Sequence, residues 1–230
     1  MVMLSMKNRM KLMASAGIKL LMGLVLVGVL IFIPAGTIHF FNGLLLVAVL
    51  FVPMLIAGVV MALRSPELLK KRLNAKEKEV EQRSVVALSG IMFVTAFVVA
   101  GLNYRYSWMV MPAWAVWSAV ALFLLSYIMY AEVLRENAYL SRTIEVQEGQ
   151  KVIDTGLYGV VRHPMYTATI LLFLSMPLVL GSLLSFVIML AYIPLIVKRI
   201  KNEERVLLEG LDGYDEYCRK VRYRIIPFIP

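Results

Sequence analysis

The side chains that could do chemistry gather in two polar clusters in the last third of the chain. The first cluster, Arg162–Pro164, precedes a long apolar run, and the second, Arg199–Glu204, follows it. Arginine and histidine can bind anionic groups, and carboxylates can bind ammonium groups or accept protons. If the apolar run between them folds back on itself, the clusters would meet and could enclose one small charged ligand.

The first cluster has the pattern of a helix start. Pro164 suits the first turn of a helix, because the N–H that it lacks would have no partner there. Free backbone N–H groups at such a start, together with Arg162 and His163, would form an anion site. The same residues also fit a simpler interpretation, in which a basic side chain and an aromatic belt lie at a membrane surface.

The second cluster places a carboxylate on the apolar face of a helix expected over Lys198–Leu211. Because burying an unpaired carboxylate is costly, we expect Glu204 to have a partner or a raised pKa. Arg199 and Glu203 are four residues apart on the neighbouring face, a spacing that also fits an ordinary surface ion pair. The apolar face comprises Val197, Ile200, Glu204, Leu207, Leu208 and Leu211.

The elements that must position these clusters are apolar segments of membrane length. Of the 230 residues, 60% are apolar and 17% are charged, whereas a soluble domain has about 45–50% apolar and about 25% charged residues. The charges fall in blocks between long uncharged stretches. This composition predicts an all-α, polytopic transmembrane helical bundle.

Six membrane spans account for the apolar stretches, since a helix needs about 20 apolar residues to cross the hydrocarbon core. The run Tyr166–Val197 is too long for one helix and too short for two long ones. We therefore expect a hairpin of two short helices that reverses at Gly181 and Ser182. A five-span chain, with this run as one tilted or kinked helix, is the alternative. The other spans lie near Lys19–Pro34, His39–Leu63, Val85–Leu102 and Met109–Tyr130.

This division predicts two regions and an orientation. Residues 1–131 form a four-helix transmembrane region, and residues 132–230 supply a cytoplasmic connector, the hairpin and the C-terminal helix. With six spans, every lysine and arginine except Arg105 falls on one side of the membrane. Basic residues concentrate on the cytoplasmic side, so both termini are expected in the cytoplasm. The opposite connections are short, which favours chemistry at the cytoplasmic face or within the bundle.

Several classes of function fit this sequence poorly. The net charge of +9 comes from basic residues beside apolar spans, which favours anionic lipid headgroups over nucleic acid. Cys218 is the only cysteine, which excludes a disulfide framework and a cysteine-based metal site, and we expect no metal. The spans carry no acidic residue, which disfavours ion-coupled transport. The basic N-terminus precedes a long apolar run without a cleavage site, so we expect a retained helix there.

The order of motifs around the expected hairpin resembles that of the isoprenylcysteine carboxyl methyltransferase family and its phospholipid methyltransferase relatives. The resemblance covers residues 154–230, and Ala168 departs from the glycine that many relatives have there. The first motif is Gly156-Leu-Tyr158 followed by Arg162-His163-Pro164-Met-Tyr166. The second is Arg199, Glu203-Glu204, Gly213-Tyr214-x-x-Tyr217, Arg222 and Ile226-Pro227.

The resemblance implies a methyltransferase that binds S-adenosylmethionine at the cytoplasmic membrane face without a Rossmann domain. It implies that Arg199 and Glu203 lie near the reacting methyl group. The cofactor carboxylate needs a cationic or N–H donor, which Arg162 or His163 could supply. The residues that the resemblance implies for holding the cofactor are Tyr158, His163, Pro164, Tyr166 and Glu204.

The acceptor is expected to be an apolar or amphipathic molecule that enters from the bilayer, either a prenylcysteine-like carboxylate or a lipid. A carboxylate acceptor needs no base and could be oriented by Arg199, whereas an amine would have to lose a proton, which Glu203 could accept. The sequence indicates no oligomeric state.

Two other classes of function are kept as alternatives. Sterol and steroid reductases share a similar hairpin with an Arg-His-Pro motif and use NADPH. They usually have Asn after the proline, where this chain has Met165, and an acidic residue soon after the tyrosine, where it has Thr167-Ala-Thr. The second alternative is a non-enzymatic membrane transporter or scaffold.

Overall fold

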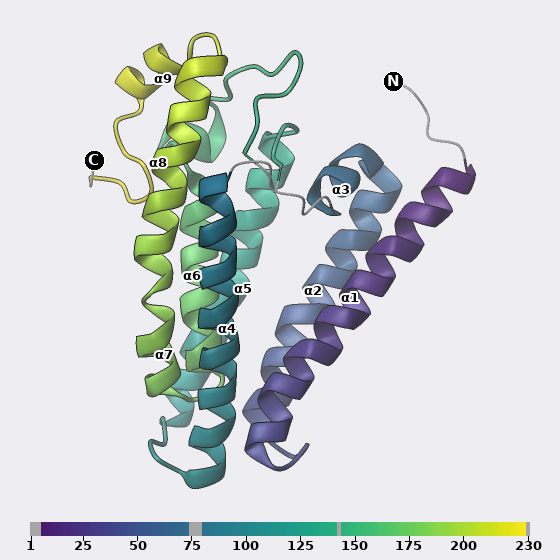
Figure 1. Ribbon diagram of the computed structural model, residues 1–230, viewed down its shortest axis with the longest axis vertical. Coiled ribbons are helices and arrows are strands. Elements are labelled where there is room, and N and C mark those ends of the chain that lie inside the picture. Colours follow the sequence, from purple (N-terminus) through teal and green to yellow (C-terminus); the bar gives the residue numbers. More distant parts are fainter. Residues whose placement is uncertain (1–5, 74–79, 142–143, 229–230) are drawn as a thin grey trace.

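Apolar stretches of membrane length fold as helices because a chain in lipid must satisfy its backbone N–H and C=O groups within its own segment. The computed structural model describes residues 6–73, 80–141 and 144–228, and these ranges form helices and loops with no β-strand. The helices stand side by side in an elongated bundle (Figure 1). Their bounds are α1 Met6–Ala35, α2 Phe41–Arg64, α3 Pro66–Leu73, α4 Val80–Tyr106, α5 Ala113–Glu136, the 3₁₀ turn η1 Gly156–Gly159, α6 Pro164–Val179, α7 Leu183–Met189, α8 Tyr192–Gly210 and α9 Tyr214–Lys220.

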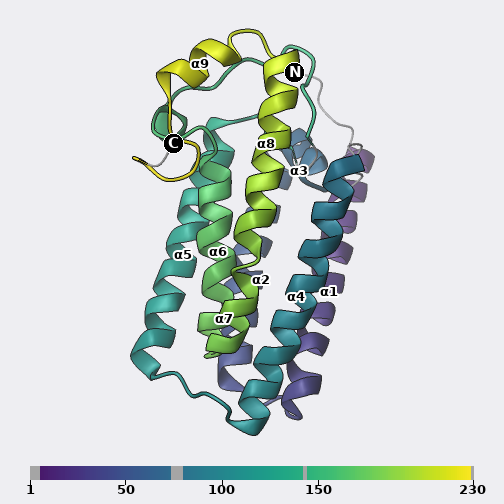
Figure 2. The ribbon, with the colours of Figure 1, turned by 60° about the vertical axis from the view of Figure 1, so that its left-hand side comes forward.

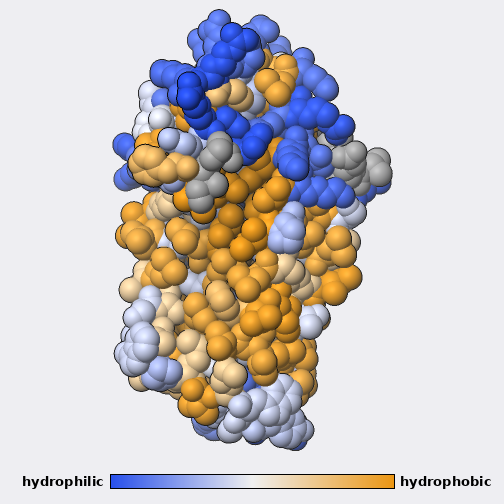
Figure 3. Space-filling view, turned by 90° about the vertical axis from the view of Figure 1, so that its left-hand side faces the viewer, coloured by the Kyte–Doolittle hydropathy of each residue, from blue (hydrophilic) through white to orange (hydrophobic). Residues whose placement is uncertain are grey.

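The bundle is that of an integral, multi-pass membrane protein. Among the described residues, five helical segments are long and apolar enough to cross a bilayer, and α6 is a shorter apolar helix. Figure 3 shows a broad apolar band below a hydrophilic end. An exposed apolar surface of this extent is costly in water, so lipid is its natural solvent. The predicted polytopic helical bundle is confirmed.

The predicted hairpin is present and reverses at the expected residues. Gly181, which follows α6, has a φ of +73°, a left-handed conformation that glycine adopts without strain. The side chain of Ser182 then accepts the backbone N–H of Ser185 and caps α7. α7 and α8 return beside α6 (Figure 2), as the six-span prediction requires.

The second arm of the hairpin is longer than predicted. The C-terminal helix expected over Lys198–Leu211 begins at Tyr192 and continues without a break to Gly210. The break before it is explained by Pro194, which has no N–H to donate to the carbonyl of Leu190. The expected start at Lys198 was wrong, because a change from apolar to charged sequence does not by itself separate two helices.

The hydrophilic end of the bundle holds α3, α9 and the start of α1 (Figures 1 and 3). Arg105, the exception to the charge pattern, lies in the last turn of α4. Lys76, Lys78 and Arg142, which belong to the pattern, lie outside the described residues. A cytoplasmic location for the hydrophilic end stays a prediction from the distribution of charge.

Helices α1 and α4 approach each other closely at Gly101. A Cβ atom at this position would lie 2.5 Å from the backbone oxygen of Ile31 and 3.0 Å from the backbone nitrogen of Ala35. Because both neighbours are backbone atoms, no side-chain rotation would relieve the clash. Small residues permit such close contact between membrane helices.

Gly101→Ala should therefore destabilise the bundle by about 1–3 kcal/mol, the usual cost of overpacking. The measurement is the Tm of the purified protein in detergent. Gly90→Ala on the same helix is the matched control, because a Cβ at Gly90 meets nothing within 4 Å. Equal Tm values for the two variants would show that α1 and α4 do not meet in this way.

Candidate functional site

The two polar clusters of the sequence meet at the hydrophilic end of the bundle. Nε of Arg162, just before α6, lies 2.8 Å from Oε1 of Glu204 on α8. Nε2 of His163 lies 3.3 Å from the same oxygen. The hairpin therefore brings the clusters into contact, as the sequence predicted.

Glu204 is the buried centre of an ion-pair network. It also pairs with Arg224, whose Nε lies 2.9 Å from Oε2. The side chains of Arg162 and Glu204 are only 8% and 10% exposed. Breaking a buried pair is costly, because it leaves the other charge uncompensated. Of the two states predicted for Glu204, the structure shows the one in which the carboxylate has partners.

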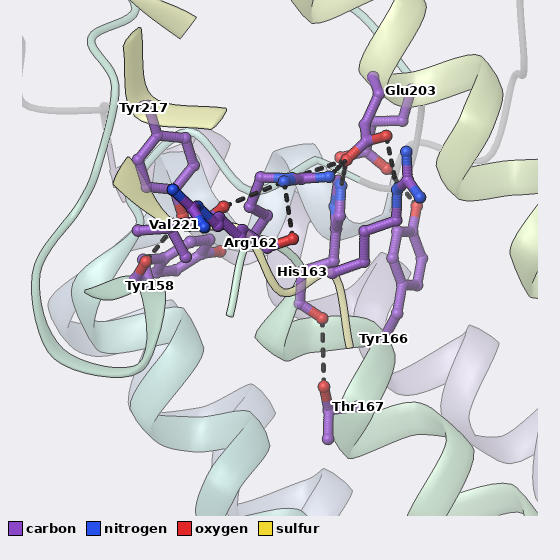
Figure 4. Close-up of polar contacts among 11 residues, drawn as sticks. Tyr158, Arg162, His163, Tyr166, Thr167, Glu203, Tyr217 and Val221 are labelled. Carbon is purple, nitrogen blue, oxygen red and sulfur yellow. Dashed lines mark hydrogen bonds and ion pairs between the residues drawn. The ribbon is translucent and has the colours of Figure 1, made fainter. Parts of the chain in front are cut away.

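The backbone at the start of α6 is paired with the segment that follows α9. The N–H of Arg162 donates to the carbonyl of Tyr223 at 2.8 Å, and the N–H of His163 donates to the carbonyl of Arg224 at 2.9 Å. Nη1 of Arg162 donates to the carbonyl of Val221 at 3.0 Å (Figure 4). The N–H groups of Arg162 and His163 are thus used within the chain, as buried backbone donors usually are, and the anion site at the first turn of α6 stays a prediction.

A tyrosine hydroxyl joins the two residues predicted to act on the methyl group. Nε of Arg199 donates to Oη of Tyr166 at 3.0 Å. The hydroxyl of Tyr166 in turn donates to Oε2 of Glu203 (Figure 4). Tyr166 is buried, whereas Arg199 and Glu203 are half-buried on α8. The arrangement differs from an exposed surface pair, because a buried phenol from α6 fixes both side chains.

A cavity of about 90 Å³ lies where η1, α6, α8 and the α5–η1 connector meet. Pro164 and Glu204 are not among the residues that line it. Pro164 is the buried first residue of α6, as predicted. The predicted site residues that do line it are Tyr158, Arg162, His163, Tyr166, Arg199 and Glu203. The structure therefore brings most of the candidate residues to one wall and places Glu204 behind that wall.

Tyr158 is held in this wall by two contacts that the sequence did not indicate. Nδ2 of Asn137 donates to its hydroxyl at 3.0 Å, and the hydroxyl of Tyr217 donates to its backbone carbonyl at 2.8 Å. Burial raises the pKa of Tyr158 to about 12, so its phenol is protonated at neutral pH. Tyr158 can therefore offer the cavity a neutral aromatic surface.

The connector between α5 and η1 forms the outer wall of the cavity. Its lining residues include Tyr139, Ser141, Ile144 and Ile153. Sequence reasoning did not identify them, because the connector has neither a helical period nor a motif. The only signal was its position next to Gly156-Leu-Tyr158. These contacts depend on how the connector folds over α8, which a local pattern does not encode.

Comparison with known proteins gives a family match within this region. Residues 118–209 match the sequence model of the isoprenylcysteine carboxyl methyltransferase (ICMT) family. The matched region runs from α5 to the end of α8 and includes Tyr158, Arg162, Glu203 and Glu204. The resemblance seen in the motifs is thus confirmed for this part of the chain, and it supports a membrane methyltransferase.

A second comparison connects the chain with a reductase. It is 34% identical over 90 residues to "Delta(14)-sterol reductase TM7SF2" of Mus musculus, a match of 38% of this chain and 22% of that protein. The match thus spans about a fifth of the length of that curated relative. The chain is therefore similar in part both to the methyltransferase family and to this sterol reductase.

Proposed function

We propose that the protein transfers a methyl group from S-adenosylmethionine to a carboxylate of an amphipathic acceptor at the membrane surface. The observation that carries this proposal is the convergence of Tyr158, His163, Tyr166, Arg199 and Glu203 on one cavity. Most of that wall lies within the region that matches the methyltransferase family.

The side chains around the cavity suit the parts of this cofactor. An adenine ring packs well against aromatic surfaces, and Tyr158, Tyr214 and Tyr217 offer such surfaces. His163 and Arg162 both line the cavity and would bind the cofactor carboxylate. Glu145 and Glu203 are half-buried carboxylates that line the cavity, and Glu203 would bind the ammonium group of the cofactor. Glu204 would support this wall by holding Arg162.

The cofactor supplies a methyl group on a positively charged sulfur, which is already activated for transfer. The chain must then align the acceptor with that methyl group and exclude water. A guanidinium binds a carboxylate through parallel N–H donors, and Arg199 would orient the acceptor in this way. A carboxylate acceptor requires no base, so Glu203 would not remove a proton. It would instead fix Tyr166, whose hydroxyl donates to Glu203 and accepts a hydrogen bond from Nε of Arg199.

The cavity must enlarge to take such a ligand. Its volume is about 90 Å³, whereas sites for small molecules have about 300–1,000 Å³. The described residues of the connector form no helix, and this wall would move outward more easily than α6 or α8. Ligand binding and connector motion are therefore expected to be coupled.

Binding of S-adenosylhomocysteine, the demethylated product, should change hydrogen exchange in residues 144–153. We expect slower exchange in this segment and little change in α2, which is remote from the cavity. The measurement is amide exchange followed by mass spectrometry, with and without ligand. If the ligand binds tightly but exchange in the connector is the same with and without it, the role of the connector as the mobile wall would be contradicted.

The alternative proposal is an NADPH-dependent reductase, which the similarity to the mouse sterol reductase favours. Calorimetry in detergent separates the two proposals. We expect binding of S-adenosylmethionine and no binding of NADPH. The reverse result would overturn the methyltransferase proposal. If S-adenosylmethionine binds as expected, transfer of its tritiated methyl group into a lipid extract of the host would identify the labelled acceptor.

A further inference from the structure

We propose that residues 221–228 anchor the hydrophilic end of the bundle to an anionic membrane surface, and that this contact holds one wall of the proposed cofactor cavity in place. The anchor would insert the side chains of Ile226 and Phe228 into the membrane interface and set Arg222 against lipid phosphates. The membrane contact does not depend on the proposed function, and only its effect on cofactor affinity rests on it.

The segment 221–228 returns from α9 to the upper end of the membrane helices (Figures 1 and 2). The hydroxyl of Thr167, in the first turn of α6, donates to the carbonyl of Ile225 at 2.7 Å. Tyr166 in the same turn contacts Arg199 on α8. Arg199 lies just beyond the point at which α8 changes from apolar to charged sequence, and such a change marks the edge of the hydrocarbon core. Residue 225 therefore lies at the level of the membrane surface.

Two large apolar side chains of this segment are exposed at that level. Ile226 is 52% exposed and Phe228 is 86% exposed, whereas the neighbouring Ile225 packs against the buried cluster between α4, α6 and α8. The ring of Tyr223 lies beside that of Phe228, with their centroids 5.6 Å apart. Aromatic and aliphatic side chains are stable in the layer between lipid headgroups and acyl chains. A bilayer would therefore cover the side chains that the bundle leaves exposed here.

The charge of this part of the chain complements an anionic surface. Residues 219–230 include four basic side chains and no acidic one. Arg219 and Lys220 belong to α9 and pair with carboxylates, and Arg224 pairs with the buried carboxylate of the site. Arg222 is exposed and lies between the paired side chains and the apolar ones. Basic residues next to apolar ones in this way favour membranes that contain anionic lipid.

The same segment holds the start of α6 through its backbone. Two of its carbonyls, those of Tyr223 and Arg224, accept backbone N–H groups at that start. A third, that of Arg222, accepts Nη1 of Arg162 at 3.1 Å. Arg162 and His163 both line the proposed cofactor cavity. A contact that holds the segment on the membrane would hold these two side chains as well, so cofactor affinity should depend on lipid composition.

The test measures amide hydrogen exchange of residues 221–228 in nanodiscs, without cofactor. One nanodisc contains phosphatidylcholine alone, and the other contains phosphatidylcholine and phosphatidylserine. We expect exchange to be about fivefold slower in the anionic nanodiscs, the effect of one arginine near an anionic surface. Arg222→Gln should remove most of this difference. Arg219→Gln is the matched control and should keep it, because α9 lies farther from the apolar band (Figure 1).

A second set of variants tests the insertion of the apolar side chains. Ile226→Ser together with Phe228→Ser should speed exchange of the segment about tenfold in anionic nanodiscs, because their apolar surface no longer leaves water. Leu208→Ser is the matched control. Leu208 is 54% exposed on α8, but it lies about 15 Å along the helix from Lys198, on the side away from the apolar band. Its replacement should leave exchange unchanged.

Binding of S-adenosylhomocysteine in the same nanodiscs measures the effect on the cavity. Its affinity should be about fivefold higher in the anionic nanodiscs, in proportion to the slower exchange. Arg222→Gln should lower the affinity in anionic nanodiscs to its value in neutral ones. The side chain of Arg222 is exposed and does not line the cavity, so a loss of this kind would come through the membrane contact.

Equal exchange in the two nanodiscs would overturn the inference. Unchanged exchange in the double serine variant would overturn it as well and would leave Ile226 and Phe228 to a protein partner. Lipid-dependent exchange in a protein that binds no S-adenosylhomocysteine would support the anchor and contradict the proposed function alone. Lipid-dependent exchange with equal ligand affinity in both nanodiscs would support the anchor and contradict its coupling to the cavity.

Discussion

Arg199→Met should bind S-adenosylmethionine nearly as well as the unmodified protein and transfer its methyl group about 10²–10³ times more slowly. A loss of this size is typical when one donor is removed from a preorganised site. Arg199 lines the cavity, and its Nε lies 3.0 Å from Oη of Tyr166. If its guanidinium aligns the acceptor carboxylate, its removal affects the transfer step more than cofactor binding. The measurement is the rate of tritium transfer at saturating cofactor, beside cofactor affinity by calorimetry.

Two further variants serve as a control for this result and as a test of the hydroxyl that joins Arg199 to Glu203. Arg205→Met removes an arginine from the exposed face of α8 and should leave the rate unchanged. Tyr166→Phe keeps both charged residues but removes the hydroxyl between them, so it should slow transfer by a smaller factor, about tenfold. If Arg199→Met lost affinity for the cofactor in proportion to its loss of rate, Arg199 would be a cofactor-binding residue instead.

Glu204→Gln should weaken cofactor binding about 100-fold or more without unfolding the membrane helices. Glutamine keeps the shape of the side chain but removes the charge that Arg162 and Arg224 share. Breaking a buried ion pair costs about 3–5 kcal/mol, and Arg162 lines the cavity. We expect the start of α6 and the segment after α9 to loosen together. Calorimetry measures the affinity, and limited proteolysis measures the loosening of residues 221–228.

Glu209→Gln is the matched control, because Glu209 is exposed on the same helix. It should leave both affinity and proteolysis unchanged. Wild-type affinity in Glu204→Gln, with faster proteolysis, would show that Glu204 holds the tail and has no part in the cofactor site. Wild-type behaviour in both measurements would contradict the ion-pair network itself.

The sequence predicted those features that depend on local composition. An apolar run interrupted by Gly181 and Ser182 indicated a hairpin, because glycine tolerates the left-handed conformation of a tight reversal. A carboxylate on an apolar helical face indicated either a partner or a raised pKa, because an unpaired charge there is costly. Both features follow from physical chemistry within a few residues of the position concerned.

The features that the sequence did not predict depend on long-range contacts. The carbonyl groups of Tyr223 and Arg224 accept the N–H groups of Arg162 and His163, and every residue type has such a carbonyl. Nothing in the side chains therefore identifies this pairing. The same holds for the connector, which covers the cavity through the way its backbone turns.

The pairing of residues 162 and 163 with residues 223 and 224 has a consequence for biosynthesis. A ribosome makes the chain in order, so the start of α6 leaves the exit tunnel before Tyr223 and Arg224 do. During that interval the start of α6 lacks its acceptors, and Glu204 lacks one of its arginines. A nascent chain would therefore complete the wall around Arg162 and Glu204 only when the segment after α9 arrives, and not helix by helix.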